Sequence, residues 1–434
     1  MLEDALDHHL DVAIVHADTG ESVTYGKLRE RTQDLAIQFY IRGWEKGQSI
    51  AVILPNKVIF PLTVFAAAKV GLRCVLVNVS QKSRLWVNSL RPMKVDYIIT
   101  TQEILHYVRD ACQSLRSVKE ILVLNRIDDE RDKKEYRLSI EMRYDLLLGK
   151  PPGWGALPDW IIKDEEVMLQ PFTAQNTRGT EIRQGQFTKS LMQIRALETD
   201  LNQSDVVAVS LPLYDTFNFI HSGTLPYLVG CKVVLTESLN PKRFFEVVQE
   251  HKVTYSHVPA AVIKELAAGK VDYDLSTLKT LLCTEPLEKE IYEALKKNYP
   301  QIKLKQGYGS IDLTPPLMLS PADKIKPGSV GVLLPDTEAK VINPATKKEV
   351  GVGEEGEIWV KGDQVFSQWW VPPPDPPRPI DLKEGKGKNK DKPKPEPKVP
   401  PPNPKGNEFD DEGFFKTGDI GKVDADGYWW ITKK

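Results

Sequence analysis

Short apolar runs alternate with stretches of helical periodicity over most of the chain. The first series has strand-like segments at residues 49–54, 74–79, 97–100 and 121–125, separated by helical stretches at 58–70 and 103–115. The second series has strand-like segments at 206–211, 232–236, 253–257 and 278–283, with helical stretches at 241–251, 260–268 and 287–298. Buried strands separated by helices are typical of parallel sheets covered on both faces. The pattern predicts an α/β fold with two parallel-sheet lobes.

Residues 24–43 show how the pattern defines a single helix. Thr24 is a suitable N-cap, Leu28, Leu35 and Phe39 recur on one face, and Gly43 is suited to a left-handed stop. The segment is therefore expected to be an amphipathic helix.

The pattern changes after about residue 321, where glycines and prolines punctuate short strands at 331–334, 339–342 and 357–360. These strands predict a small β-barrel or sheet. We therefore expect a first α/β lobe at 1–165, a second at 166–320, and a β-barrel subdomain at 321–434.

Within the last subdomain, residues 371–406 hold 13 of the 32 prolines and eight lysines. Such a segment buries too little apolar surface to offset the entropy of ordering, so it predicts a disordered insertion. A solvated surface loop is one interpretation, and a docking site for a protein that binds proline-rich motifs is another.

Composition narrows the function classes. The 434 residues are 41% hydrophobic and 27% charged, with a formal net charge of -2, which gives no field that would attract nucleic acid. The four cysteines are widely separated and form no C-x-x-C pair, so neither a disulfide framework nor a zinc site is expected. No secretory signal and no membrane span are expected. A cytoplasmic location fits, and a peroxisomal one stays open.

Sequence motifs that indicate a binding or catalytic site are concentrated in the C-terminal third of the chain. Residues 414–421 read FFKTGDIG and 424–431 read DADGYWWI, while QGYG stands at 306–309 and GEIWVKG at 356–362. In this order the motifs resemble the adenylate-forming superfamily of acyl-CoA synthetases, 4-coumarate-CoA ligases and luciferases. The resemblance covers nearly the whole chain apart from the insertion. It implies ATP or AMP, Mg²⁺ and CoA as cofactors, and a carboxylic acid as substrate.

The resemblance assigns nucleotide-binding roles to two of these motifs. Asp419 matches the aspartate that hydrogen-bonds the ribose hydroxyls, a role that suits an acceptor-only carboxylate. Tyr308 matches the aromatic residue beside adenine, and Gly307 and Gly309 would let the backbone approach the ring. The alternatives are a tight turn at the T-G-D motif and a tyrosine that only fills the core.

The phosphate loop departs from the family pattern S-G-T-T-G-x-P-K-G. Thr173 and Thr177 match its phosphate-binding threonines, but Gln175 and Arg178 replace glycines and Glu181 replaces the lysine. Glycines let successive N–H groups surround a triphosphate, and a carboxylate repels it. Impaired ATP handling is therefore expected.

Three further positions differ from the family. Asp312 stands at the position of the Mg²⁺-binding glutamate and could still hold the metal. Asp215 replaces a histidine of the acid site, and His221, six residues further on, is interpreted as structural. Glu285 replaces a glycine near the acid carboxylate, where it would be unfavourable unless it faces solvent.

The resemblance implies a small C-terminal lid domain that supplies the adenylation lysine, and we expect that domain to be missing from a chain that ends at Lys434. We therefore expect an AMP-binding acid–thiol ligase-like protein that is weak or inactive as given. The alternatives are a non-catalytic protein that binds nucleotide or an acyl ligand, and an interaction scaffold that uses residues 371–406.

Overall fold

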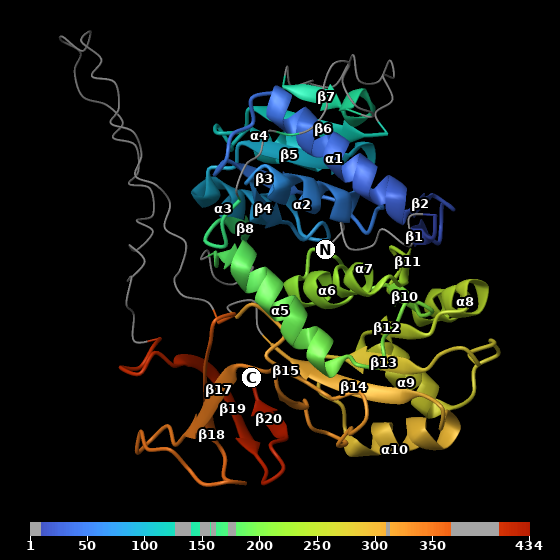
Figure 1. The fold of residues 1–434 in the computed structure, drawn as a ribbon, viewed down its shortest axis with the longest axis vertical. Helices are drawn as coiled ribbons and strands as arrows, with labels where there is room; N and C mark the ends of the chain where they lie inside the picture. The colour runs from blue at the N-terminus through green and yellow to red at the C-terminus, as the bar shows by residue number, and fades with distance from the viewer. Residues whose placement is uncertain are drawn as a thin grey trace.

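Three β-sheets and the helices between them make up the computed structural model (Figure 1). The described residues are 10–125, 140–147, 157, 162–171, 179–309, 313–365 and 408–434. The predicted insertion at 371–406 and the threonines of the predicted phosphate loop lie outside these ranges.

The first lobe is built on a seven-stranded sheet in the order β7-β6-β5-β3-β4-β8-β9, parallel except for β9. Its strands are β3 (Ser49–Val52), β4 (Arg73–Leu76), β5 (Tyr97–Thr101), β6 (Glu120–Leu124), β7 (Glu141–Arg143), β8 (Val167–Leu169) and β9 (Ile182–Arg183). Its helices are α1 (Tyr25–Ile41), α2 (Ile59–Lys69), α3 (Ser83–Met93) and α4 (Leu105–Cys112), with 3₁₀ turns at Gln102–Ile104 and Tyr144–Leu147. The predicted cap is confirmed, because the Thr24 hydroxyl accepts the backbone N–H of Lys27 and Gly43 has a φ of +74°.

The second lobe is built on a nine-stranded sheet in the order β16-β15-β14-β13-β12-β10-β11-β1-β2, whose centre is parallel. Its strands are β1 (Val12–His16), β2 (Ser22–Thr24), β10 (Val206–Val209), β11 (Lys232–Leu235), β12 (Tyr255–His257), β13 (Thr280–Cys283), β14 (Lys303–Tyr308), β15 (Met318–Leu319) and β16 (Val332–Leu333). Its helices are α5 (Gln184–Leu197), α6 (Thr216–His221), α7 (Leu225–Val229), α8 (Pro241–His251), α9 (Ala260–Ala268) and α10 (Lys289–Asn298). The two predicted parallel-sheet lobes are confirmed.

The third sheet is antiparallel and contains β17 (Thr337–Ile342), β18 (Gly356–Gly362), β19 (Phe415–Val423) and β20 (Trp429–Lys433), in that order. In the described residues it is an open sheet, one of the two forms expected, because β17 and β20 each pair with one strand of the sheet.

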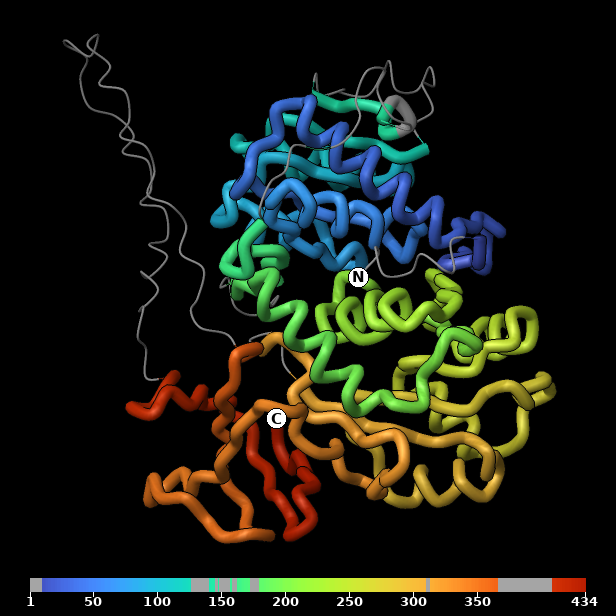
Figure 2. The backbone as a smooth tube through the Cα atoms, in the orientation of Figure 1, coloured from blue at the N-terminus to red at the C-terminus, as the bar shows by residue number. Residues whose placement is uncertain are grey.

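Strand pairing does not follow the predicted linear division at residues 165 and 320. β1 and β2 lie near the N-terminus but pair into the second lobe through β11, whereas β8 and β9 follow residue 165 and pair into the first lobe through β4. β16 lies beyond residue 320 and still belongs to the nine-stranded sheet. Figure 2 shows α5 running from the first lobe down to the second. The chain therefore crosses between the lobes more than once, which periodicity alone does not reveal.

Asn56, in the loop after β3, joins the two lobes. Its side-chain amide donates to the carbonyl oxygens of Leu211 and Thr236, each at 3.0 Å, and its oxygen accepts the N–H of Leu213 at 2.8 Å. All three partners belong to segments that follow β10 and β11. Because Asn56 is 5% exposed, water cannot readily replace these bonds.

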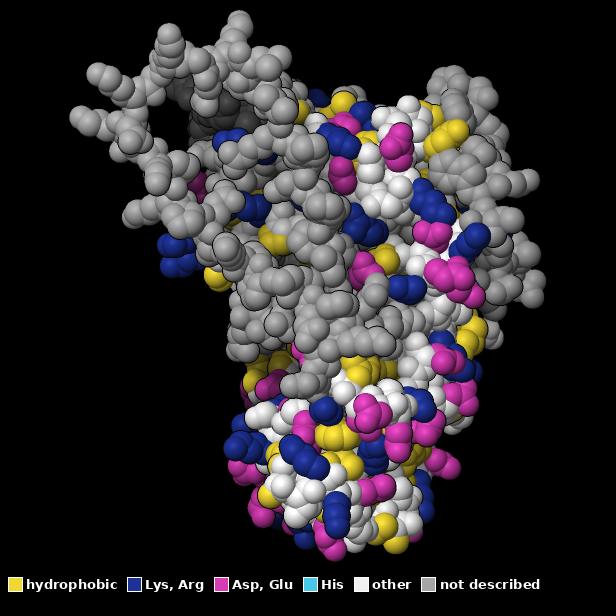
Figure 3. Space-filling view, turned by 90° about the vertical axis from the view of Figure 1, so that its left-hand side faces the viewer, with side chains coloured by type: hydrophobic (Ala, Val, Ile, Leu, Met, Phe, Trp, Pro, Cys, Tyr) yellow, Lys and Arg dark blue, Asp and Glu magenta, His cyan; other side chains and the backbone are white. Residues whose placement is uncertain are grey.

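Charges of both signs are mixed on the surface (Figure 3), and the net charge of the chain is close to zero. On the face in Figure 3, basic and acidic side chains are interspersed over the part of the surface drawn in colour. Among the described residues, no helix is long and apolar enough to cross a membrane.

Replacing Asn56 tests whether it links the lobes. Asn56→Ala should lower the free energy of unfolding by about 2–4 kcal/mol, because three buried backbone groups lose their partner. Urea unfolding measures this loss. The control, Asn88→Ala, changes an exposed helical position and should shift stability by less than about 0.5 kcal/mol. Equal effects of the two substitutions would show that Asn56 does not join the lobes.

Candidate functional site

Tyr308 is the last residue of β14 and is 1% exposed. β14 pairs in parallel with β13 and antiparallel with β15, where Tyr308 lies opposite Met318. This pairing on both sides fixes the tyrosine at the carboxyl end of β14, in contact with the four-stranded sheet.

Asp419 reaches Tyr308 from a bulge in β19. Pairing shifts between Glu357 and Trp359 of β18, so the T-G-D motif bulges out opposite Ile358. The Thr417 hydroxyl donates to the carbonyl of Ile358 at 2.7 Å and accepts the N–H of Asp419 at 3.1 Å, while Gly418 has a φ of +78°. Bulges of this kind redirect side chains. The motif therefore does form the tight turn that the sequence left open.

The turn directs the Asp419 carboxylate to the Tyr308 hydroxyl, which donates a hydrogen bond of 2.5 Å. The Nζ of Lys434 lies 5.7 Å from the centre of the Tyr308 ring. Two residues that the sequence selected from separate motifs are thus in direct contact, with a cation beside them.

The two glycines beside Tyr308 are required by packing within the protein. A Cβ at Gly307 would lie 3.0 Å from the Phe217 ring, and one at Gly309 would lie 2.7 Å from the Pro315 side chain. Neither has a positive φ. Contact with neighbouring side chains therefore explains both glycines, whether or not the backbone also approaches a ligand.

Three of the predicted site residues, Thr173, Thr177 and Asp312, lie outside the described residues. In the described ranges, no group of three or more His, Cys, Asp or Glu side chains could hold a metal ion.

The acidic substitutions near the predicted acid site have structural partners. Asp215 caps α6, where its side chain accepts the N–H of Asn218 at 2.9 Å. Glu285 is exposed and accepts the N–H of Ala260 at 2.9 Å, at the start of α9. Carboxylates at helix N-termini are stabilising. Glu285 therefore stabilises α9, which agrees with the expectation that it could face solvent.

Three buried polar side chains form a network with Glu198, the residue after α5. The Lys305 ammonium donates to Glu198 Oε2 at 2.6 Å, and neither side chain is exposed. The Tyr255 hydroxyl donates to Oε1 at 2.9 Å, and His221 Nε2 lies 3.2 Å from the same oxygen. His221 is thus structural, as predicted. Burial alone would raise the pKa of Glu198, but Lys305 and His221 outweigh it and lower the pKa from 4.5 to about 2.

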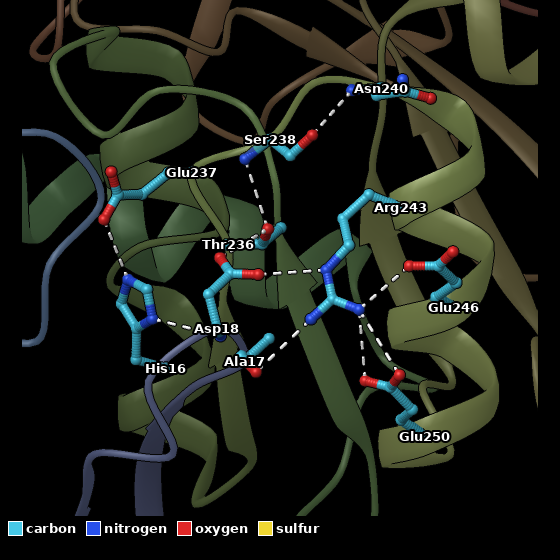
Figure 4. Close-up of polar contacts among 10 residues, drawn as sticks. All are labelled: His16, Ala17, Asp18, Thr236, Glu237, Ser238, Asn240, Arg243, Glu246 and Glu250. Carbon is cyan, nitrogen blue, oxygen red and sulfur yellow. Dashed lines mark hydrogen bonds and ion pairs between the residues drawn. The ribbon is translucent and has the colours of Figure 1, made fainter.

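A second polar cluster borders a shallow cleft of about 670 Å³ at the carboxyl ends of β1 and β11 (Figure 4). Arg243 of α8 donates to Asp18 at 3.0 Å and to Glu246 at 3.2 Å, while His16 Nε2 lies 3.2 Å from Glu237. Figure 4 shows these side chains pointing toward one another. Because Arg243 already binds the carboxylates of Asp18 and Glu246, the cluster ties the end of β1 to α8 and is a weaker candidate for a ligand site.

Comparison with known proteins identifies the family. The family model described as AMP-binding enzyme matches residues 2–370. The chain belongs to the AMP-binding enzyme family.

Relatives and solved structures agree with membership of the AMP-binding family. The chain is 27% identical over 405 residues to a probable 4-coumarate–CoA ligase 1 of Dictyostelium discoideum, covering 90% of this chain and 68% of the relative. The fold matches a long-chain-fatty-acid-CoA ligase of Archaeoglobus fulgidus with a TM-score of 0.80, at 21% identity, over 100% of this chain and 83% of that one. It also matches the anthranilate CoA ligase AuaEII, solved with anthranoyl-AMP, with a TM-score of 0.81 at 18% identity, over 100% and 77% of the two chains. The predicted resemblance is confirmed.

Sequence reasoning missed three buried residues near the site of this AMP-binding protein: Phe217, His257 and Lys305. His257 ends a strand that the sequence did predict, and parallel strands bring their carboxyl ends to one edge. The position of His257 at this edge could therefore have identified it from the sequence. The sequence contains no indication of the partner of Lys305, because Glu198 lies 107 residues away.

The Glu198 network predicts a pH-dependent effect on stability. Glu198→Gln should lower the free energy of unfolding by about 3–5 kcal/mol at pH 7, because it leaves the buried Lys305 charge without a counterion. A carboxyl with a lowered folded-state pKa stabilises the protein above its ordinary pKa and loses that effect as pH falls through the folded value. The difference between the two proteins should therefore shrink by about 3 kcal/mol between pH 4.5 and 2.

Urea unfolding of both proteins, from pH 7 down to the lowest pH at which they stay folded, measures this difference. Glu265→Gln, an exposed position on α9, is the control and should follow the wild type at every pH. A difference that stays constant down to pH 3 contradicts the proposed ionisation of Glu198.

Proposed function

We propose that this chain binds the adenosine part of ATP or AMP at Asp419 and Tyr308 and activates a carboxylic acid as its acyl-adenylate. The hydrogen bond between these two side chains, 111 residues apart in sequence, is the observation that supports the proposal most strongly. One Asp419 oxygen accepts the Tyr308 hydroxyl, and a carboxylate has further acceptor sites for the two ribose hydroxyls. Membership of the AMP-binding family supports the same assignment.

In the proposed reaction a carboxylate oxygen of the acid attacks the α-phosphorus of ATP. The bond to the leaving oxygen breaks, and pyrophosphate departs with the electron pair. A thiol then attacks the acyl carbon and AMP leaves. The relatives named as CoA ligases support CoA as the source of that thiol. Asp312 would hold Mg²⁺, which neutralises phosphate charge when bound, and Thr173 and Thr177 would donate to the phosphates.

A second candidate function is binding of nucleotide and acid without turnover. The sequence of the phosphate loop favours it, because Gln175 and Arg178 stand where the family has glycine and Glu181 where it has lysine. Burial lowers the pKa of Arg73 on β4, and the charge of Glu181 opposes part of that shift, so Glu181 acts toward the first lobe. A loop without glycines and lysine holds a triphosphate poorly, while AMP requires less of it.

Adenosine binding is tested by substitution of Asp419. Asp419→Ala should weaken AMP binding about 10- to 100-fold, because charge-assisted hydrogen bonds to the ribose are lost. Isothermal titration with AMP measures the change. Asp411→Ala removes an exposed carboxylate from the same subdomain and should leave affinity unchanged. An unchanged affinity in Asp419→Ala, or equal losses in the two variants, would sink the assignment.

ATP–pyrophosphate exchange across a panel of fatty and aromatic acids separates the two candidates. Exchange that occurs with at least one acid in the wild type and is lost in Asp419→Ala supports the ligase. AMP binding without exchange for any acid supports binding without turnover, and wild-type protein that binds no AMP contradicts both.

A further inference from the structure

A cavity of about 480 Å³ lies in the first lobe, at the carboxyl ends of β3, β5 and β6. Its wall includes Ile59 at the start of the helix after β3, Thr101 at the end of β5 and Leu124 at the end of β6. The volume falls within the range of about 300–1,000 Å³ that small-molecule sites occupy. Neither Tyr308 nor Asp419 lines this cavity, so it is separate from the candidate adenosine site.

The cavity lies where connections of the seven-stranded sheet leave in opposite directions. β3 has β4 on one side and β5 on the other. The helix after β3, α2, packs on the face of the sheet that carries Val52 and Ile99, whereas the helix after β5, α4, packs on the face that carries Ala51 and Ile98. In open parallel sheets the crevice between such strand ends is the usual position of a ligand. The cavity therefore occupies a position where the topology of the first sheet predicts one.

Two buried hydroxyl groups in the wall of the cavity have no hydrogen-bond partner in the described part of the chain. Thr101 is 1% exposed, and its side chain does not cap the 3₁₀ turn that follows it. Tyr144, in the 3₁₀ turn after β7, is 8% exposed. Both side chains line the cavity, and neither bonds to another described residue. Because buried polar groups are normally paired, these two hydroxyls are expected to bind a group that enters the cavity.

The start of α2 adds hydrogen-bond donors to the same wall. Val58 is the N-cap of this 11-residue helix and Ile59 is its first residue, and both line the cavity. No side chain caps the helix, and its first turn contains no acidic residue. The N–H groups at a helix N-terminus lack partners within the helix and form the positive end of its dipole. They favour an anion, independently of the two hydroxyls.

The charges beside Tyr144 also favour an anion. Arg31 of α1 and Glu21 line the cavity with it. Burial raises the pKa of Tyr144, so its hydroxyl stays protonated and can donate a hydrogen bond. Arg31 lowers that pKa more than Glu21 raises it, so the two charges together produce a positive potential at the hydroxyl.

Much of the remaining wall is apolar. Leu35 of α1, Leu62 of α2 and Leu147 line the cavity, while Lys27 on its rim is already paired with Glu30 at 2.6 Å. Apolar walls with a few convergent polar groups are typical of small-molecule sites. A guest with one carboxylate and an apolar body matches this division of the wall.

We propose that this cavity is a second ligand site, which binds a small monocarboxylate with an apolar body. The carboxylate accepts hydrogen bonds from the hydroxyls of Thr101 and Tyr144 and from the backbone at the start of α2, with Arg31 beside it. Asn56, which joins the two lobes, lies two residues before Val58, so a ligand at this site adjoins the connection between the lobes. The inference does not depend on the proposed function.

Isothermal titration of the full chain tests the site with matched pairs of probes. Hexanoate, benzoate and 3-phenylpropanoate are each compared with the amide of the same acid, which is similar in shape and carries no charge. The protein is first saturated with 3-phenylpropanoyl-sulfamoyl adenosine, a mimic of the acyl-adenylate, so that the proposed acid site is filled. At least one carboxylate should then bind about tenfold tighter than its amide or more, because charge-assisted hydrogen bonds are stronger than neutral ones.

Substitutions in the wall locate that binding. Thr101→Val and Tyr144→Phe each remove one hydroxyl with little change of shape, and each should weaken carboxylate binding about five- to twentyfold. Arg31→Gln changes an exposed side chain, which serves where a buried substitution prevents folding, and should weaken binding about threefold or more. Tyr107→Phe, the control, changes an exposed tyrosine of α4 outside the cavity and should keep the wild-type affinity.

The inference is overturned if none of the three carboxylates binds, or if carboxylate and amide bind equally in all pairs. Carboxylate binding that is unchanged in Thr101→Val, Tyr144→Phe and Arg31→Gln would also overturn it, because the binding would then lie elsewhere on the molecule. If the wild type does not bind the adenylate mimic, the proposed function fails, and the same titrations without the mimic decide the inference.

Discussion

The ion pair between Glu198 and Lys305 fixes the end of α5 against β14, and the candidate site depends on this arrangement. Glu198 follows α5, the helix that leads from the first sheet to the second, and Lys305 lies on β14, three residues before Tyr308. Removing two charges from water is expensive, and the cost is offset only where every remaining hydrogen-bonding site is filled. On Glu198, Tyr255 and His221 occupy the carboxylate oxygen that Lys305 does not bind. Displacement of α5 from β14 would break this network, so the helix and the strand are held in one arrangement.

The lobes are joined by polar contacts as well as by apolar packing. Asn56 satisfies backbone groups beyond β10 and β11, and the Tyr308–Asp419 bond connects the second lobe to the four-stranded sheet. Each of these bonds joins residues more than 100 positions apart in sequence. Directional bonds of this kind fix the relative position of the parts more narrowly than apolar contact does.

Periodicity predicted the secondary structure well because most segments are buried on a regular face. The helices at 241–251 and 260–268 have the predicted bounds, and several strands end one or two residues earlier than expected. The pairing of β1 with β11 and of β8 with β4 was not predictable, because strand partners are chosen by tertiary packing rather than by local pattern. For the site, the resemblance to the adenylate-forming superfamily selected Tyr308 and Asp419, whereas His257 and Lys305 required knowledge of which strands are neighbours.

The arrangement of the sheets also explains how the phosphate loop can diverge separately from the rest of the site. The loop connects β8 and β9, which both belong to the seven-stranded sheet. Tyr308 and His257 lie at strand ends of the nine-stranded sheet, and Asp419 lies on the four-stranded one. Gln175 and Arg178 therefore belong to a connection of the first lobe, while Tyr308 contacts Asp419 of β19 and His257 contacts Phe217 of α6. Loss of glycines in the loop therefore leaves the Tyr308–Asp419 contact and the packing around His257 unchanged. Under the proposed function, weak triphosphate binding and retained adenosine binding are physically compatible, because they depend on different sheets.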